Sequence, residues 1–96
     1  MFRRYKEKIA YVVDKKTLAR IEFLNRSEDV IEVYYTHVEK CLEGQKMSIQ
    51  LMEQLVKYLK ETNKKVIPLC IYTDYWFRKN PQHADLVYHK RRWNDK

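Results

Sequence analysis

The stretch Lys64-Lys65-Val66-Ile67-Pro68-Leu69-Cys70 decides the fold class of this chain of 96 residues. Its short apolar run, residues 66–69, predicts a strand that is covered on both faces. Residues 73–79 follow with the aromatic sequence Tyr75-Trp76-Phe77 and predict a short helix. Asn80-Pro81 ends that helix, because the residue before a proline is disfavoured in the helical region. The order of strand, cysteine and helix indicates an α/β protein.

A long amphipathic helix is predicted immediately before this strand. From Met47 onward, apolar residues recur every three or four positions, at Leu51, Leu55 and Leu59, over about four turns. Asn63 is the predicted C-terminal cap of this helix. A helix of this length between two strands allows them to pair in parallel through a right-handed crossover.

Three strands are predicted on the N-terminal side of the helix. Residues 5–14 and 17–24 show alternating apolar positions around the polar turn Asp14-Lys15-Lys16, and residues 30–38 are rich in β-branched and aromatic side chains. The predicted architecture is therefore a three-stranded antiparallel meander, a long helix, a parallel fourth strand and a short C-terminal helix.

The end of the chain completes this outline. Thr73 is the predicted N-cap of the last helix, with Asp74 near its positive end. Residues 84–88 are expected to add a short final strand, and the basic tail 89–96 has no core periodicity. We expect one domain over residues 1–96, with its core in residues 5–88.

Charge and cysteine content limit the class of protein. Lys and Arg number 20 against 13 Asp and Glu, a formal charge of +7 that favours polyanionic partners such as a phosphorylated cofactor or nucleic acid. Two cysteines are too few for a disulfide scaffold, and no apolar run is long enough for a signal peptide or a membrane span. These features predict a cytoplasmic protein with reduced thiols and no membrane partner.

In order and residue type, residues 64–87 resemble the C-terminal half of the minimal single-domain GNAT-type N-acetyltransferases. Members of that family bind acetyl-CoA. They keep a cysteine at the end of this strand, and Cys70 occupies that position here. The resemblance implies a GNAT-like α/β fold, acetyl-CoA as the cofactor, and transfer of the acetyl group to an amine acceptor that the sequence does not identify.

The junction between the third strand and the long helix is the first candidate for cofactor binding. Free N–H groups and the dipole at a helix N-terminus attract phosphate. In the resembled family, a basic residue and alternating glycines cradle the CoA pyrophosphate there. Gly44 and Gln45 match that pattern, whereas Glu43 replaces the basic residue and Lys46 a glycine. By resemblance, the cofactor contacts are Thr36, Val38, Gly44, Gln45, Lys46, Met47, Ser48, Lys79 and Asn80.

Cys70 is the candidate catalytic residue. It follows the predicted parallel strand, where ligands usually bind in α/β folds, and the next helix begins within a few residues and lowers a thiol pKa through its dipole. By resemblance it lies beside the thioester, and either Cys70 or a bound amine attacks the thioester carbonyl. The alternative structural role is that of a small buried apolar side chain.

Two other functions stay open at this stage. Glu43 and Lys46 are compatible with a degenerate GNAT fold that binds a partner and no longer holds CoA. The net charge and the tail sequence Tyr88-His89-Lys90-Arg91-Arg92-Trp93 are compatible with a small nucleic-acid-binding protein. The spacing of His37, Cys41, Cys70 and His83 does not predict a metal site.

Overall fold

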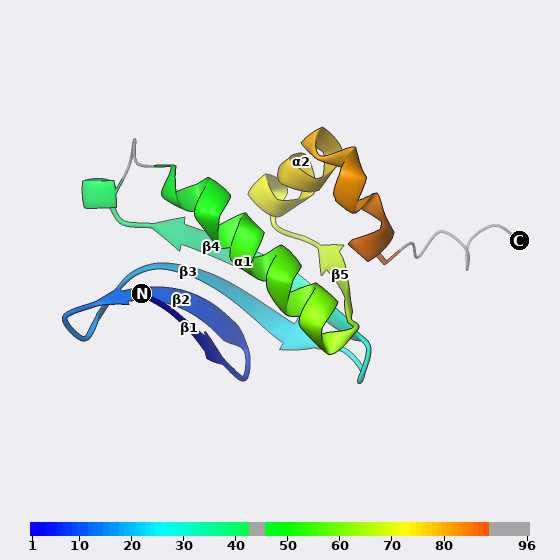
Figure 1. The fold of residues 1–96 in the computed structure, drawn as a ribbon, viewed down its shortest axis with the longest axis horizontal. Coiled ribbons are helices and arrows are strands. Elements are labelled where there is room, and N and C mark those ends of the chain that lie inside the picture. Colours follow the sequence, from blue (N-terminus) through cyan, green and yellow to red (C-terminus); the bar gives the residue numbers. More distant parts are fainter. Residues whose placement is uncertain (43–45, 89–96) are drawn as a thin grey trace, which may run out of the picture.

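A computed structural model describes residues 1–42 and 46–88 and contains one five-stranded sheet (Figure 1). The strands lie side by side in chain order: β1 (Phe2–Tyr5), β2 (Lys8–Val13), β3 (Lys16–Asn25), β4 (Val30–Val38) and β5 (Lys65–Pro68). Strands β1 to β4 are antiparallel, and β5 is parallel to β4. The predicted α/β class, the meander and the parallel strand are therefore confirmed.

β1 is a strand that the sequence did not predict. The predicted strand 5–14 is in fact the end of β1, a turn at residues 6 and 7, and β2. The turn sequence Lys6-Glu7 contains none of the Gly, Pro, Asn or Asp residues that mark most turns, so the pattern shows no break there. The expected turn between β2 and β3 is present, and Asp14 and Lys15 have φ of 50° and 68°.

Helix α1 (Met47–Thr62) covers one face of the sheet, as Figure 1 shows. Its buried side chains are those that the spacing predicts, and they pack against buried residues of β2 to β5. Asn63 ends the helix in the left-handed region, with φ of 57°, and its N–H donates to the Leu59 carbonyl. The predicted cap is confirmed.

The C-terminal segment differs from prediction in two places. Helix α2 (Ile71–Lys79) has Cys70 as its N-cap, three residues before the predicted N-cap Thr73, which is buried within the first turn. Instead of a strand, the 3-10 helix η2 (Pro81–Leu86) follows, because Pro81 is suited to the first position of a helical turn. Within the predicted strand 84–88, Val87 alone forms a bridge with β5, opposite Val66.

A β-bulge in β4 separates the two parallel strands. Phe23 lies opposite Val33 and Glu22 lies opposite Tyr35, so Tyr34 is the extra residue on β4. A bulge bends its strand and increases the local twist. The parallel pairing ends at Val33 and Pro68, while β4 continues to Val38. The structure therefore opens a fork between β4 and β5.

The described segments, 1–42 and 46–88, include no helix that is long and apolar enough to cross a membrane.

Candidate functional site

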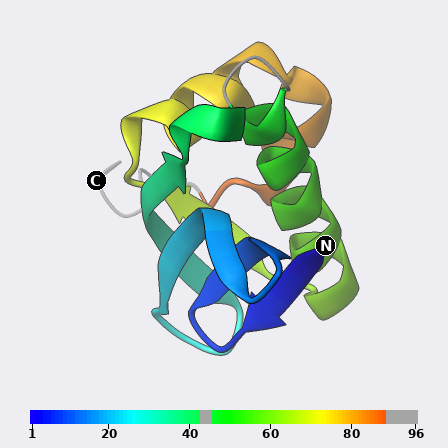
Figure 2. The same ribbon diagram turned by 90° about the vertical axis from the view of Figure 1, so that its left-hand side faces the viewer.

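Cys70 lies at the base of the fork between β4 and β5. The N–H groups of Leu69 and Cys70 both donate to the Val33 carbonyl, at 2.9 Å each, directly before the bulge. This double hydrogen bond turns the chain from β5 into α2. Figure 2 shows the first turn of α2, in yellow, beside the end of β4. The strand-end position predicted for Cys70 is thus found, with the added role of helix N-cap.

The sulfur of Cys70 is surrounded by hydrogen-bond donors. Its Sγ lies 3.5 Å from the Thr36 hydroxyl of β4. Burial raises the pKa of the Cys70 thiol, but hydrogen bonding by the Thr36 hydroxyl and by the N–H groups and hydroxyl of the first turn of α2 outweighs it. The pKa therefore lies below its ordinary value. This arrangement favours the thiolate, which is the nucleophilic form of cysteine.

Thr73, in the first turn of α2, is a second side chain near the sulfur, and the sequence analysis assigned it a different role, that of N-cap. It is the one polar residue among those fully buried in the described structure. Its hydroxyl is near enough to the Cys70 sulfur to lower the pKa of the thiol, but it forms no hydrogen bond of standard geometry in the described structure. A buried hydroxyl without a full hydrogen bond is costly, and the Cys70 thiolate would supply an acceptor for it. The sequence signal for this pair was the pattern Cys-x-x-Thr, which places Cys70 at the N-cap and Thr73 at the third helical position.

The N-terminus of α1 forms the other part of the candidate site. Lys46 is the N-cap, with φ of 59° and ψ of 28°, and its side chain makes no capping hydrogen bond. The left-handed region is the one that glycine adopts without strain, so Lys46 takes the backbone conformation expected for the family's glycine. No acidic residue lies in the first turn of α1.

The remaining predicted contacts are distributed over both helices. Val38 ends β4 next to Ala19, and Met47 is buried in the core, so only its backbone could meet a ligand. Ser48 is half-buried in the first turn of α1. Gly44 and Gln45, with Glu43, lie outside the described residues.

Lys79 and Asn80 lie at the opposite end of α2 from Cys70, about 13 Å along a helix of nine residues. Lys79 places its ammonium 5.6 Å from the Tyr75 ring, and the Asn80 amide donates to the Trp76 carbonyl at 2.8 Å. These contacts hold the helix end. Their predicted role at the cofactor stays a prediction.

The chain matches a known protein family over most of its length. The model of the family described as GCN5-related N-acetyl-transferase matches residues 8–86, most of the chain. The chain belongs to this GNAT family. The matched region runs from β2 through η2 and includes both helix N-termini and Cys70. β1 lies outside it.

A solved structure supports the fold of this family member. The NMR structure described as a GCN5-like putative N-acetyltransferase from Staphylococcus aureus superposes with a TM-score of 0.73 and 21% identity. The match covers 92% of this chain and 87% of that protein, so the two folds correspond over nearly their full lengths. No curated protein sequence matches the chain.

Proposed function

We propose that this GNAT family member binds acetyl-CoA in the fork between β4 and β5 and transfers the acetyl group to an amine. The observation that carries the proposal is the Cys70 sulfur, held at the N-terminus of α2 within reach of Thr36 and with a lowered pKa. Acetyl-CoA would supply an activated acetyl thioester, and family membership supports that choice of cofactor.

The chain's own groups fit the two ends of such a cofactor. The N–H groups at the start of α1, which the Lys46 side chain does not cap, suit the pyrophosphate. The part of β4 beyond Val33 lacks a strand partner on the β5 side among the described residues, and offers backbone groups to an extended arm. Lys46 in the left-handed region favours this function over a fold that has lost its anion-binding loop.

Two routes for the acyl transfer start from the same bound state. In one, the Cys70 thiolate attacks the thioester carbonyl, the CoA thiolate leaves and takes a proton, and an amine then takes the acetyl group and restores the thiol. In the other, the amine attacks directly and Cys70 lines the cleft. In both, the first turn of α2 and the Thr36 hydroxyl stabilise negative charge at the reacting centre.

The binding test is a titration of the isotope-labelled protein with acetyl-CoA, followed by amide chemical shifts. We expect shifts at residues 36–38, 46–48 and 70–73, and smaller ones at residues 79 and 80 if the end of α2 also contacts the cofactor. An absence of shifts at about 1 mM acetyl-CoA would refute the proposal, because it would limit the binding free energy to no more than ~4 kcal/mol.

The chemical test uses Cys70→Ala with Cys41→Ala as the matched control. Hydroxylamine serves as a small amine acceptor, and acetohydroxamate is the product measured. If Cys70 is the nucleophile, Cys70→Ala retains binding but loses at least about 100-fold in rate, as expected when a nucleophile is removed. Intact mass after incubation with acetyl-CoA alone should show one acetyl group, absent in Cys70→Ala and present in Cys41→Ala. If Cys70→Ala keeps the full rate and the unsubstituted protein shows no acetylated intermediate, the amine attacks the thioester directly.

A further inference from the structure

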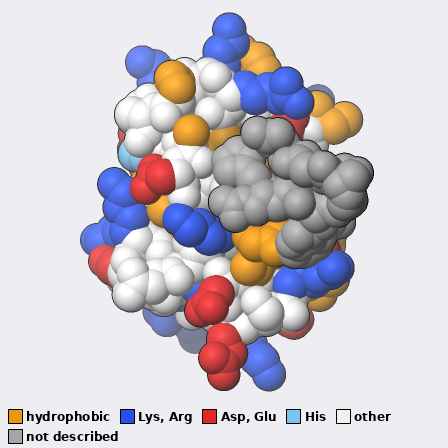
Figure 3. All heavy atoms as spheres, turned by 90° about the vertical axis from the view of Figure 1, so that its right-hand side faces the viewer, with side chains coloured by type: hydrophobic (Ala, Val, Ile, Leu, Met, Phe, Trp, Pro, Cys, Tyr) orange, Lys and Arg blue, Asp and Glu red, His pale blue; other side chains and the backbone are white. Residues whose placement is uncertain are grey.

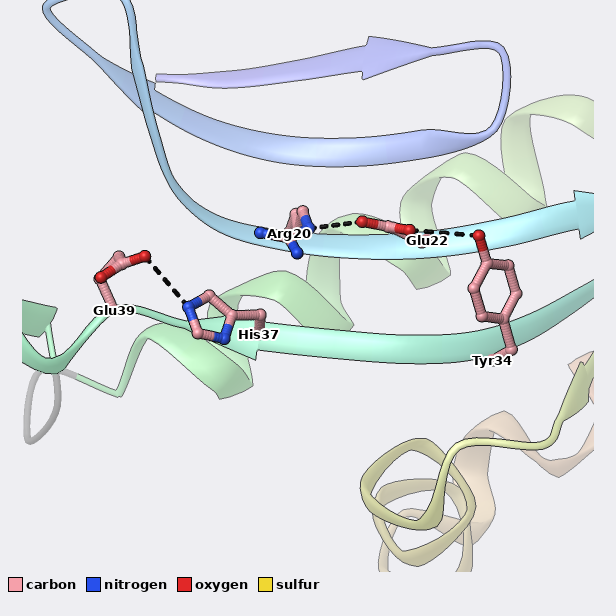
Figure 4. Close-up of polar contacts among 5 residues, drawn as sticks. All are labelled: Arg20, Glu22, Tyr34, His37 and Glu39. Atoms are coloured by element: carbon pink, nitrogen blue, oxygen red, sulfur yellow. Dashed lines mark hydrogen bonds and ion pairs between the residues drawn. The ribbon is translucent and has the colours of Figure 1, made fainter.

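The face of the sheet opposite α1 is uncovered in the described structure and carries a regular set of side chains. Strand register places Arg3, Ala10, Arg20 and His37 in one row across β1 to β4, and Tyr5, Lys8, Glu22 and Tyr35 in the next. Figure 4 views this face, with α1 behind the strands. Ala10 lies between the two arginines in its row and is fully buried, so neighbouring side chains cover it.

Three tyrosines of this open face are exposed. Tyr5, Tyr34 and Tyr35 have 46%, 46% and 41% of their surface accessible, and the bulge in β4 is the reason that two consecutive tyrosines are both exposed. The Lys8 ammonium lies 4.9 Å from the centre of the Tyr5 ring, and the Arg20 guanidinium lies 5.2 Å from that of Tyr35. Tyr35 is also stacked on His37, with ring centres 6.3 Å apart.

Positive charge predominates in these two rows. Arg3, Lys8 and Arg20 stand against one carboxylate, Glu22. The hydrogen bond from Arg20 is the main reason that the pKa of Glu22 is lowered, and the Tyr34 hydroxyl donates to the same carboxylate at 3.1 Å (Figure 4). Within residues 1–42 and 46–88, no carboxylate forms an ion pair with Arg3 or Lys8.

A shallow depression completes the surface. It has a volume of about 340 Å³ and lies between the β1–β2 turn and β4, lined by Tyr5, Lys6, Glu7, Lys8, Glu22 and Tyr34. At the other end of the molecule, which carries β5, α2 and η2, Lys and Arg side chains lie among Asp and Glu side chains (Figure 3).

We propose that this open face binds single-stranded nucleic acid. Exposed aromatic rings interleaved with cations are the features that such sites use, since the rings stack on bases and the cations meet the phosphates. Tyr5 and Tyr35 are the stacking residues, and Arg3 and Lys8 contact the backbone. A duplex is excluded from this mode because its bases are already stacked, and an acidic peptide has no bases for the rings to hold.

The experiment measures fluorescence anisotropy of a labelled oligothymidylate of about 12 nucleotides, a length within the range of known single-strand sites. We expect binding that weakens steeply as salt is raised. Tyr35→Ala should weaken it by about fivefold or more, the loss expected for one stacked base. Arg3→Ala should reduce the slope of log affinity against log salt concentration by the amount expected for about one phosphate contact.

Tyr75→Ala is the matched control, because Tyr75 on α2 is 54% exposed and also carries a cation, Lys79, over its ring. It should bind the oligonucleotide like the unsubstituted protein, and thermal melts of each variant establish that it is folded.

Four outcomes would overturn the proposal. They are no binding at low salt, equal losses in Tyr35→Ala and Tyr75→Ala, equal affinity for duplex of the same length, and equal affinity for polyglutamate. Oligonucleotide binding at low salt is measured without acetyl-CoA. The nucleic-acid proposal and the acetyl-CoA proposal can therefore fail independently of each other.

Discussion

At the scale of single residues, the chemistry of Cys70 depends on a threonine that is 34 positions away in the sequence. The Thr36 hydroxyl approaches the sulfur because β4 passes the N-terminus of α2. Each hydrogen bond to a thiolate lowers its pKa, whereas burial alone would raise it. The geometry, and not the mere presence of a cysteine, therefore lowers the pKa of Cys70.

Thr36→Val tests this dependence. The substitution keeps the shape of the side chain and removes its donor, so the pKa of Cys70 should rise. In a Cys41→Ser background, alkylation by iodoacetamide near neutral pH should become about threefold to tenfold slower, because one hydrogen bond contributes about 1 kcal/mol. In unfolding concentrations of urea the two proteins should react equally. Equal rates in the folded state would show that Thr36 does not act on the thiol.

The same shift has a consequence for stability. The pKa of Cys70 is lower in the folded than in the unfolded chain. The contribution of the Cys70 thiolate to the free energy of unfolding is therefore complete above the ordinary thiol pKa. It is lost as the pH falls through the folded value. Cys70→Ser should remove this part of the pH dependence.

At the scale of elements, the start of α1 combines two opposing effects. Lys46 occupies the left-handed region, which costs a residue with a Cβ about 1–2 kcal/mol. Its positive charge nevertheless lies where an anionic ligand would bind. The helix thus begins with a strained residue that carries a positive charge.

Lys46→Gly should stabilise the protein by about 0.5–1 kcal/mol, since the relief of strain exceeds the entropy that glycine adds to the unfolded chain. The free energy of unfolding from urea titration is the measurement. Lys46→Ala is the control, because alanine removes the charge but keeps the Cβ, and it should give no gain. A similar gain in both variants would place the cause in the charge and not in the backbone.

At the scale of the whole molecule, the formal charge of +7 spreads over a small protein with a radius of gyration of 13.6 Å. Most charges lie within about two Debye lengths of one another at low salt, so their mutual repulsion opposes folding. Four arginine–carboxylate ion pairs in the described structure offset only part of this repulsion, because exposed pairs contribute little.

Raising NaCl from about 20 mM to about 200 mM should therefore increase the free energy of unfolding, by up to about 1 kcal/mol. Lys16→Glu, at an exposed position, lowers the net charge to +5 by replacing a cation with an anion, and should flatten this salt dependence. A stability that falls as salt is added would show that the ion pairs dominate.

The sequence by itself determined the parts of the fold that local patterns encode. The spacing of Leu51, Leu55 and Leu59 gave α1, and the apolar run after Lys65 gave β5, because the helical and extended periods differ. It also identified the family and placed Cys70 at the end of a strand. β1 escaped prediction because the Lys6-Glu7 turn carries no turn residue.

Only the tertiary structure decided how those parts form a site. The bulge at Tyr34 depends on register between two strands, and the Thr36–Cys70 contact joins residues from different elements. The rows on the open face arise from pairing across four strands. No local pattern contains such information, because hydrogen bonds between distant segments fix it and the sequence lists those segments only in order.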